Sequence, residues 1–418
     1  MNILLLEQPT RNRGDESAHR GLVEILLSTY PDSTIYSPYY GNTQEEIEAM
    51  RVKSERVIYI NLISKLNKLS PHRIVKLLMM LRLPILIYCI PFMWKYVRLI
   101  RQADIVVGAP GGIEMGGFMG WFHIGLFWLV KFEKKPCFYF GRSIGPFSED
   151  TYFKKLFRNY CLSLFKYFSF LSLRDSRSQK VADEMGINYI STIDSAFLRS
   201  ISSPIPKEVL SFINQHQYII FVPNALAWHH NYSNNYTVAD FTSFWTRVLD
   251  SLLSAYPDKK VIMLPQTTFV PWIHDGYPFF KDIAKNCICP SHVYVLSDQY
   301  GSDVQQGIIR DAEFLIGARY HSIIFSINQN VPFISLSYEH KMTGVLQILG
   351  KLDCEVDIDA FFRGHTIHTV DVKSLINQIL LMAKHLQKDE QARVKAQAIA
   401  LEGFEEFKQA VNRIKLSC

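Results

Sequence analysis

Cysteine is scarce in this chain of 418 residues, which has seven of them, an odd number without regular spacing. A disulfide-held scaffold is therefore excluded, and a reducing compartment is favoured. The sequence has no CxxC or HxxxH spacing, and Cys287 with Cys289 is a weak metal signal, so we expect no bound metal and no resident cofactor. Hydrophobic residues make up 48% of the chain and charged residues 20%, the balance of an ordinary globular protein.

Segments typical of export or of membrane insertion are also missing. The stretch 1–9 has no basic region before its short apolar run, so it is predicted to be a buried first strand rather than a signal peptide. The uncharged apolar run Leu83–Trp94 has twelve residues, fewer than the roughly twenty that cross a bilayer. We therefore expect a cytoplasmic protein without a transmembrane helix.

Acidic residues are nearly absent from one segment. Residues 51–101 contain eleven Lys and Arg but a single acid, Glu55, which gives the segment a charge of +10. Since the whole chain sums to +6, the remainder carries −4. A basic region on a slightly acidic protein is typical of binding to a membrane surface, a nucleic acid or another polyanion.

Residues 73–101, inside this segment, allow two interpretations. Basic flanks with Trp94 beside a short apolar run suit a helix lying in the interface of an anionic membrane leaflet. Alternatively, the residues form a core helix pair kinked at Pro84 and Pro91, with basic ends in solvent. Nucleic acid is disfavoured as a partner because the charges alternate with Leu, Ile and Met instead of stacking aromatics. We expect a peripheral protein on the inner face of the cytoplasmic membrane.

Short apolar runs alternate with helical patterns, which predicts an α/β fold of two doubly wound parallel sheets facing a cleft. Strands are predicted at 2–7, 34–37, 105–107, 137–140 and 170–173 in the first half, and at 218–222, 261–264, 292–296, 314–316 and 333–336 in the second. The Ser- and Pro-rich stretch 200–206 is predicted to link the halves. After about residue 371 the chain is predicted to be helical to its end.

The expected domains follow from this pattern. The first covers 1–200 and carries the basic apolar insertion 51–101. The second covers 207–385, and a C-terminal helix over 386–418 is expected to pack back on the first domain.

Four loops that follow predicted strands in the first half contain residues that packing alone would not select. They are 12–16, 108–112, 141–146 and 174–178, and glycines in them let a ligand approach the backbone. Asp15 is predicted to cap a helix over 16–27, and Asp15 and Glu16 are also candidates for contacting a substrate.

The second half has a sharper group of candidates. Arg319 and His321 follow one predicted strand, and Lys341 follows the next. Neighbouring parallel strands would bring two cations, an imidazole and a helix N-terminus to one edge, which suits a small phosphate ester. Histidine can exchange a proton near neutral pH. The alternative is a surface salt-bridge cluster.

Trp228, His229 and Gln266 also follow predicted strands of the second half. An aromatic ring beside hydrogen-bonding groups suits the apolar face and the hydroxyls of a sugar, so all three are candidates for binding an acceptor. An ordinary loop is the competing interpretation.

Taken together, these motifs resemble the polysaccharide pyruvyltransferase family over about residues 2–350. The resemblance is carried by Asn12-x-Gly14-Asp15, Gly141-x-Ser143-x-Gly145-Pro146, Arg174-Asp175-x-x-Ser178, Asp194-x-Ala196-Phe197, Arg319-x-His321 and Tyr338-x-x-Lys341. Two positions depart from the family pattern, since Arg11 stands where Gly is usual and Asp175 where Glu is usual.

The resemblance implies a GT-B-like fold with phosphoenolpyruvate as donor and a cyclic ketal on a sugar of a bacterial exopolysaccharide or capsule as product. It implies that Arg174, Arg319, Lys341 and Ser143 bind phosphoenolpyruvate. It also implies that His321, Arg319 and Lys341 take part in catalysis. The second domain would then hold the donor, and the first would face the acceptor and the membrane. We expect the acceptor to be a galactose-type hexose on a lipid-diphosphate-linked oligosaccharide.

The charges suit this chemistry. Phosphoenolpyruvate carries about three negative charges, which Arg174, Arg319 and Lys341 would balance. We expect His321 to protonate the enol carbon before a sugar hydroxyl attacks. The alternatives are a GT-B nucleotide-sugar glycosyltransferase and a non-catalytic, membrane-docked module of a glycan assembly complex.

Overall fold

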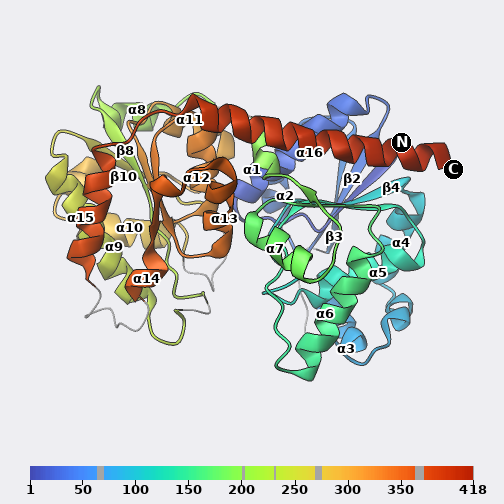
Figure 1. The fold of residues 1–418 in the computed structure, drawn as a ribbon. Helices are drawn as coiled ribbons and strands as arrows, with labels where there is room; N and C mark the ends of the chain where they lie inside the picture. The colour runs from blue at the N-terminus through green and yellow to red at the C-terminus, as the bar shows by residue number, and fades with distance from the viewer. Residues whose placement is uncertain (64–69, 200–202, 230–231, 269–274, 363–370, 418) are drawn as a thin grey trace. The chain divides into compact units, whose positions relative to one another are not determined.

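The chain folds into two compact units. A computed structural model describes residues 1–417 except 64–69, 200–202, 230–231, 269–274 and 363–370 (Figure 1). Unit 1 consists of Met1–Thr10, Ala18–Arg199 and Gln397–Cys418, and unit 2 of Arg11–Ser17 and Ser200–Ala396.

The sheet of unit 1 has seven parallel strands in the order β3-β2-β1-β4-β5-β6-β7. Because the order reverses between β1 and β4, the sheet is doubly wound. Its strands are β1 (Asn2–Leu6), β2 (Thr34–Tyr40), β3 (Val57–Ile63), β4 (Ile105–Gly108), β5 (Cys137–Arg142), β6 (Phe170–Leu173) and β7 (Ile190–Ser191).

Helices cover both faces of this sheet. Leu4 and Leu6 of β1 belong to one hydrophobic cluster, and Ile3 and Leu5 belong to another, as the alternation of side chains along a strand requires. Its helices are α1 (Arg13–Thr29), α2 (Gln44–Met50), α3 (Pro71–Met80), η1 (Pro84–Cys89), α4 (Met93–Gln102), α5 (Trp121–Phe132), α6 (Tyr152–Phe165) and α7 (Ser176–Glu184).

The C-terminal helix α16 (Glu390–Ser417) completes the second of these clusters. Phe404 and Phe407 are buried against Phe138 and Phe140 of β5, with ring centroids 5.0 Å apart for Phe138 and Phe407. The last part of the chain is therefore part of the core of unit 1.

Unit 2 repeats the architecture with six parallel strands in the order β10-β9-β8-β11-β12-β13. The strands are β8 (Tyr218–Val222), β9 (Lys260–Met263), β10 (Val293–Val295), β11 (Leu315–Gly317), β12 (Phe333–Ser337) and β13 (Glu355–Asp357). The helices include α8 (Lys207–Ile213), α9 (Val238–Ala255), α10 (Tyr277–Asn286), α11 (Ser302–Arg310), α12 (Tyr320–Asn328), α13 (His340–Leu349), α14 (Ile358–Phe362) and α15 (Val372–Ala383).

All ten strands predicted from the sequence are present, with shifts of a few residues at their ends. Three strands were not predicted. β3, β7 and β13 lie at sheet edges, where half-exposed side chains weaken the apolar pattern, and β7 and β13 are also short. The region after residue 371 is helical, as α15 and α16, with a break between Ala383 and Glu390.

The start of α1 also differs from the prediction. The helix begins at Arg13, so Asp15 lies within its first turn and does not cap it. Asn12 does this instead, because its side-chain Oδ1 accepts from the Gly14 amide at 2.7 Å and its carbonyl accepts from the Glu16 amide at 3.0 Å. Residues 11–17, which the sequence assigns to the first domain, belong to unit 2.

Residues 73–101 form α3, η1 and α4. One side of these helices is core, since Val75, Met79, Ile87, Met93 and Val97 are buried. Pro84 begins η1 and Pro91 precedes α4, as the core interpretation predicts. None of the helices in the described part of the chain is both long enough and apolar enough to cross a membrane.

Candidate active site

The predicted site residues of unit 2 follow the carboxyl ends of its strands. Arg319 comes two residues after β11 and immediately precedes α12, and Lys341 lies in the first turn of α13, which follows β12. Since β11 pairs with both β8 and β12, the loops after these three strands meet at one edge of the sheet.

Arg319 is buried in this group. Its guanidinium forms an ion pair with Asp275 and lies 6.0 Å from the centre of the Trp228 ring. Burial lowers the pKa of Arg319, while the neighbouring Tyr338 and Glu339 act in the opposite direction. Asp275 is itself held by the Ala225 amide, which donates to its Oδ1 at 2.8 Å. The charged end of Arg319 is thus fixed by a carboxylate and an aromatic ring.

Lys341 is held by Glu339. Its Nζ lies 2.7 Å from Glu339 Oε2, and Nε2 of the buried His229 lies 3.4 Å from Glu339 Oε1. Burial acts to raise the pKa of Glu339, but Lys341 and His229 outweigh it and hold this pKa well below its usual range. Glu339 is therefore ionised and orients both neighbours.

Ring contacts join these residues into one group. Trp228 meets His229 edge to face at 5.5 Å between ring centroids, and Tyr320 meets His321 in the same way at 4.9 Å. Lys341 Nζ lies 6.0 Å from the centre of the Tyr320 ring. Four predicted residues, Trp228, His229, Arg319 and Lys341, are connected through contacts of this kind, and His321 lies beside them.

Gly14 brings the first motif to His321. A Cβ atom built on Gly14 would lie 1.8 Å from both Cγ and Nδ1 of His321, so only glycine leaves room for this ring. The segment is fixed in unit 2 by hydrogen bonds of 2.8 Å, from the Arg13 amide to the Gln266 carbonyl and from the Thr268 amide to the Arg11 carbonyl. Two motifs more than three hundred residues apart thus meet at this histidine.

Glu16, a predicted acceptor-binding residue, is engaged in internal contacts. It is fully buried, lies 2.9 Å from Arg13 Nη1, and accepts from the amide and hydroxyl of Ser302 at 3.1 and 3.0 Å. It therefore holds the start of α11 against α1. Asp15 is half-buried in the same turn. Gln266 is buried, and its Nε2 has no hydrogen-bond partner among the residues that the structure describes.

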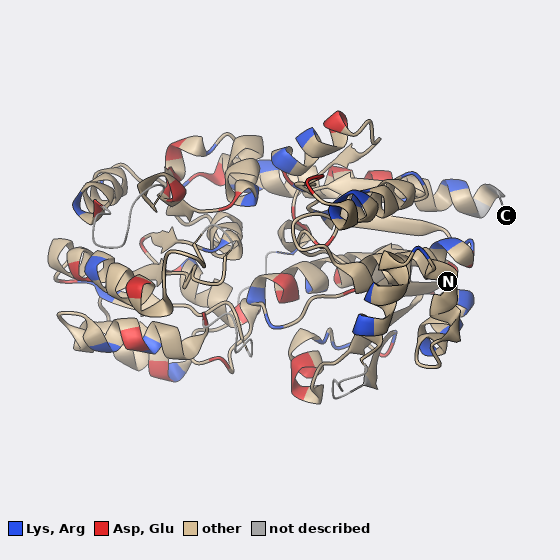
Figure 2. Ribbon diagram, turned by 90° about the horizontal axis from the view of Figure 1, so that it is seen from below, with Lys and Arg blue, Asp and Glu red and all other residues tan. Residues whose placement is uncertain are grey.

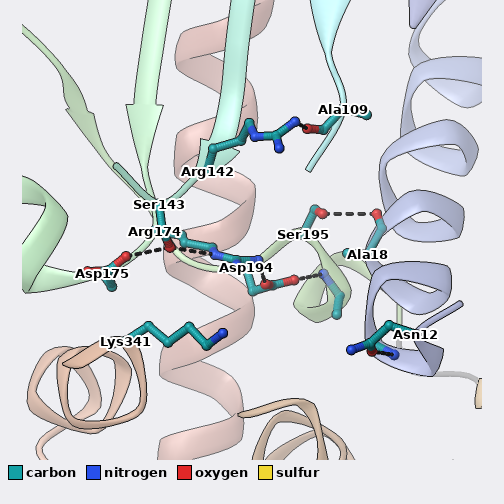
Figure 3. A network of polar contacts seen from close by, with 12 residues as sticks. Asn12, Ala18, Ala109, Arg142, Ser143, Arg174, Asp175, Asp194, Ser195 and Lys341 are labelled. Atoms are coloured by element: carbon teal, nitrogen blue, oxygen red, sulfur yellow. Dashed lines mark hydrogen bonds and ion pairs between the residues drawn. The ribbon is translucent and has the colours of Figure 1, made fainter. Parts of the chain in front are cut away.

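The predicted residues of unit 1 form a separate buried network (Figure 3). Arg174 forms an ion pair with Asp194 and donates from Nε to Ser143 Oγ at 3.1 Å. Ser143 donates in turn to Asp175 Oδ2 at 2.7 Å, and Asp175 caps α7 by accepting from the Ser178 amide at 2.8 Å. Arg174 and Ser143 thus touch each other, and the approach of Arg174 to the Arg319 group stays a prediction.

Sequence reasoning missed the carboxylates of both units. In unit 2 it missed Asp275, which no predicted strand precedes, and Glu339, which lies inside the Tyr338-x-x-Lys341 motif. In unit 1 it missed Glu114, which lies 2.5 Å from the fully buried Arg142. Burial acts to raise the pKa of Glu114, but Arg142 and His123 lower it to about 2.

Comparison with known proteins finds a family pattern and a curated relative that each match most of the chain. The sequence pattern of the polysaccharide pyruvyl transferase family matches residues 12–340. The amylovoran biosynthesis protein AmsJ of Erwinia amylovora is 24% identical over 407 residues, which cover 89% of this chain and 91% of AmsJ.

Similar solved structures belong to enzymes of the GT-B fold. The UDP-GlcNAc 2-epimerase from Neisseria meningitidis has a TM-score of 0.52 at 11% identity, covering 97% of this chain and 100% of its own. The trehalose 6-phosphate synthase from Burkholderia multivorans has a TM-score of 0.55 at 8% identity, covering 100% and 99%. The structural similarity confirms the predicted GT-B-like fold. At identities this low it shows the fold alone.

Proposed function

Because the chain belongs to the polysaccharide pyruvyl transferase family, we propose that it transfers pyruvate from phosphoenolpyruvate onto two hydroxyls of one hexose. The product is a cyclic ketal, and phosphate is released. The acceptor we propose is a galactose-type hexose in a lipid-diphosphate-linked exopolysaccharide precursor, at the inner face of the cytoplasmic membrane. The similarity to a protein of amylovoran biosynthesis supports the exopolysaccharide role.

The grouping of Arg319, Lys341 and His321 at one edge of the unit 2 sheet is the observation that carries this proposal. Arg319 and Lys341 each face one carboxylate, Asp275 and Glu339. An arginine has five N–H donors and a lysine three, so each keeps donors for the phosphate or the carboxylate of the donor substrate. Aromatic rings beside them lower the local dielectric constant, which strengthens these interactions.

The chemistry starts with a proton. His321 donates it to C3 of phosphoenolpyruvate, which becomes a methyl group and leaves C2 electrophilic. A sugar hydroxyl attacks C2 and loses its proton. Departure of phosphate makes C2 electrophilic again, and the second hydroxyl closes the ring as it loses its proton. Arg319 and Lys341 stabilise the leaving phosphate, so the proposed reaction uses no resident cofactor and phosphoenolpyruvate is a co-substrate.

The test is to incubate the protein with phosphoenolpyruvate and lipid-linked galactose-, glucose- and mannose-type acceptors. We expect phosphate release and the mass gain of a pyruvyl ketal on one of them. His321→Ala should lower turnover at least about a hundredfold, the lower end of what general acid catalysis contributes. It should still bind phosphoenolpyruvate through the two cations.

His385→Ala is the matched control, since His385 is exposed on the same unit and should turn over normally. Near-normal turnover of His321→Ala would remove this residue from the acid role. Release of a nucleotide from a sugar donor, with no use of phosphoenolpyruvate, would overturn the proposal in favour of a glycosyltransferase.

A further inference from the structure

The helices α3, η1 and α4 form an outer layer over α5 in unit 1. A Cβ atom on Gly125 of α5 would lie 2.5 Å from Val75 of α3 and 3.6 Å from Ile87 of η1, so these elements pack directly on α5. Their inward side chains belong to the core. The side of the layer that points away from α5 therefore lies at the surface of the unit.

This outer side exposes large apolar residues, which we call the docking face. Between 38% and 56% of each side chain is exposed, although a soluble helix normally places such residues inward. The members are Leu77, Leu81, Leu83, Ile85, Leu86 and Trp94. Six large apolar side chains are thus exposed within eighteen residues of chain, whereas single exposed ones are common on any protein.

Basic residues flank the docking face on both sides. Arg73, Lys76 and Arg82 are exposed on or just after α3, and Lys95 and Arg98 are exposed on α4. No Asp or Glu occurs between Glu55 and Asp104. Figure 2 colours Lys and Arg blue and Asp and Glu red along the ribbon. Arg82 lies 5.4 Å from the centre of the exposed Tyr152 ring, which extends the face onto the start of α6.

We propose that the docking face binds the surface of an anionic lipid bilayer. An apolar strip bordered by Lys and Arg, with a Trp at its edge, matches the boundary between acyl chains and negative headgroups. A face for another protein would instead be expected to keep charges of both signs at its rim. Because α3 and α4 have ten residues each, they lie on the bilayer and do not span it.

The inference deepens the proposed function and rests on it in one respect. A lipid-linked acceptor is confined to the membrane surface, and docking places unit 1 on that surface. The enzyme then meets its acceptor by diffusion in two dimensions while phosphoenolpyruvate arrives from solution.

The first test is flotation of the full-length chain with vesicles. We expect binding to phosphatidylglycerol/phosphatidylethanolamine vesicles at low salt, at least about tenfold weaker binding to phosphatidylcholine vesicles, and weakening as salt screens the charges. The wild-type chain remaining unbound to the anionic vesicles would overturn the inference.

Two variants dissect the face. The apolar variant is Leu81→Ser/Ile85→Ser/Leu86→Ser, and the charge variant is Arg73→Gln/Lys76→Gln/Arg98→Gln. All six side chains are exposed, so neither variant should disturb the core, which a thermal melt checks. Each variant should bind vesicles at least about tenfold more weakly than the wild-type chain. Apolar insertion and electrostatic attraction both contribute to membrane affinity, and each variant loses one of them.

Matched controls replace three apolar residues by Ser, or three cations by Gln, at exposed positions of unit 2. They are Leu210→Ser/Ile288→Ser/Leu381→Ser and Lys373→Gln/Lys384→Gln/Lys388→Gln. Both should float like the wild-type chain. Equal losses in controls and variants would mean that binding does not use this face, which would overturn the inference. A second result would also overturn the inference. In it, the wild-type chain does not bind vesicles but forms dimers in sedimentation, and the apolar variant does not form these dimers.

Activity separates this inference from the proposed function. The apolar variant should release phosphate normally with a water-soluble acceptor glycan and more slowly with the acceptor embedded in vesicles. If the wild-type chain binds vesicles but never releases phosphate, the proposed function fails and docking stands. If it releases phosphate but the apolar variant still floats like the wild-type chain, docking by this face fails.

Discussion

Gly14 and His321 lie far apart in the sequence and close together in unit 2. The sequence placed Gly14 in a loop after the first strand and His321 after a strand of the second half, and nothing in either pattern indicates that they touch. Likewise, the cations Arg319 and Lys341 could be predicted from their positions after strands, but their partners Asp275 and Glu339 could not. The pair of Arg319 and Asp275 joins loops that lie apart in the sequence, so it is decided by long-range packing. Glu339 stands two residues from Lys341, and the sequence alone does not show that their pair is buried.

Gly14→Ala tests the space around the His321 ring. The added methyl group would overlap His321, so the imidazole must move and turnover should fall at least about tenfold, since small misplacements of catalytic groups are costly. Gly112→Ala is the control, because its Cβ would come no closer than 3.7 Å to Glu114. Phosphate release measures both. Unchanged turnover of Gly14→Ala would show that the position of this ring does not limit the reaction.

Lys341→Gln tests the charge balance around Glu339. A buried carboxylate would lose its main counter-charge, so the free energy of unfolding at pH 7 should fall by about 1–3 kcal/mol. Lys341 depresses the pKa of Glu339, and this stabilisation is present above the pKa of an unfolded carboxyl and is lost as pH falls through the folded value.

The difference between Lys341→Gln and the wild-type chain should therefore shrink as pH falls below about 4. Urea unfolding at pH 7 and at pH 3 measures it. The control is Lys180→Gln, which removes an exposed pair with Glu184 and should change stability little at either pH. A difference that does not depend on pH would show that Lys341 stabilises the unit by packing alone.

At the scale of elements, the sequence predicted the buried strands well because continuous apolar runs are the signature of a parallel sheet covered on both faces. Edge strands carry this signature more weakly, so β3, β7 and β13 were not predicted, although the edge strand β10 was. The basic apolar segment also carried mixed signals, because its helices have one buried and one exposed apolar side. Each interpretation of residues 73–101 rests on one of these sides. The structure shows that the buried side belongs to the core, and binding of the exposed side to a membrane stays a prediction.

The helix α16 offers a test at this scale. Phe407 is buried among the rings of Phe138, Phe140 and Phe170, so Phe407→Ala should destabilise unit 1 by about 3–5 kcal/mol. Leu401→Ala, at a half-exposed position of the same helix, should cost less than about 1 kcal/mol. Denaturant unfolding followed by circular dichroism compares them, and equal stability of the two variants would contradict the role of α16 in the core.

At the scale of the whole molecule, the prediction that Arg174 of unit 1 binds phosphoenolpyruvate can be tested by itself. Arg174 has Asp194 as a partner, so a bound phosphoenolpyruvate would have to share or replace that contact. A ligand at a hundred times its Kd stabilises the protein that binds it by about 2.7 kcal/mol, which raises its Tm. Arg174→Lys keeps the charge but removes the guanidinium fork, so we expect a smaller rise in Tm with phosphoenolpyruvate than for the wild-type chain.

The rise in Tm, rather than Tm itself, is the measurement, because Arg174→Lys alters a buried ion pair even without ligand. Arg199→Lys is the control, since Arg199 is paired with Glu24 at 2.7 Å in the same unit and has no proposed ligand. If both variants respond to phosphoenolpyruvate like the wild-type chain, Arg174 does not bind the donor.

Neither unit is a continuous stretch of chain, and two of the four passages between them fall inside α1 and α16. A chimaera joined at Arg199/Ser200 would therefore separate the first unit from Phe404 and Phe407 and would give the second unit a foreign Gly14. A chimaera that exchanges unit 1 between relatives therefore has to include residues 397–417 with unit 1 and to leave residues 11–17 with unit 2. Exchanging unit 1 as a whole therefore means exchanging three separate segments of the chain.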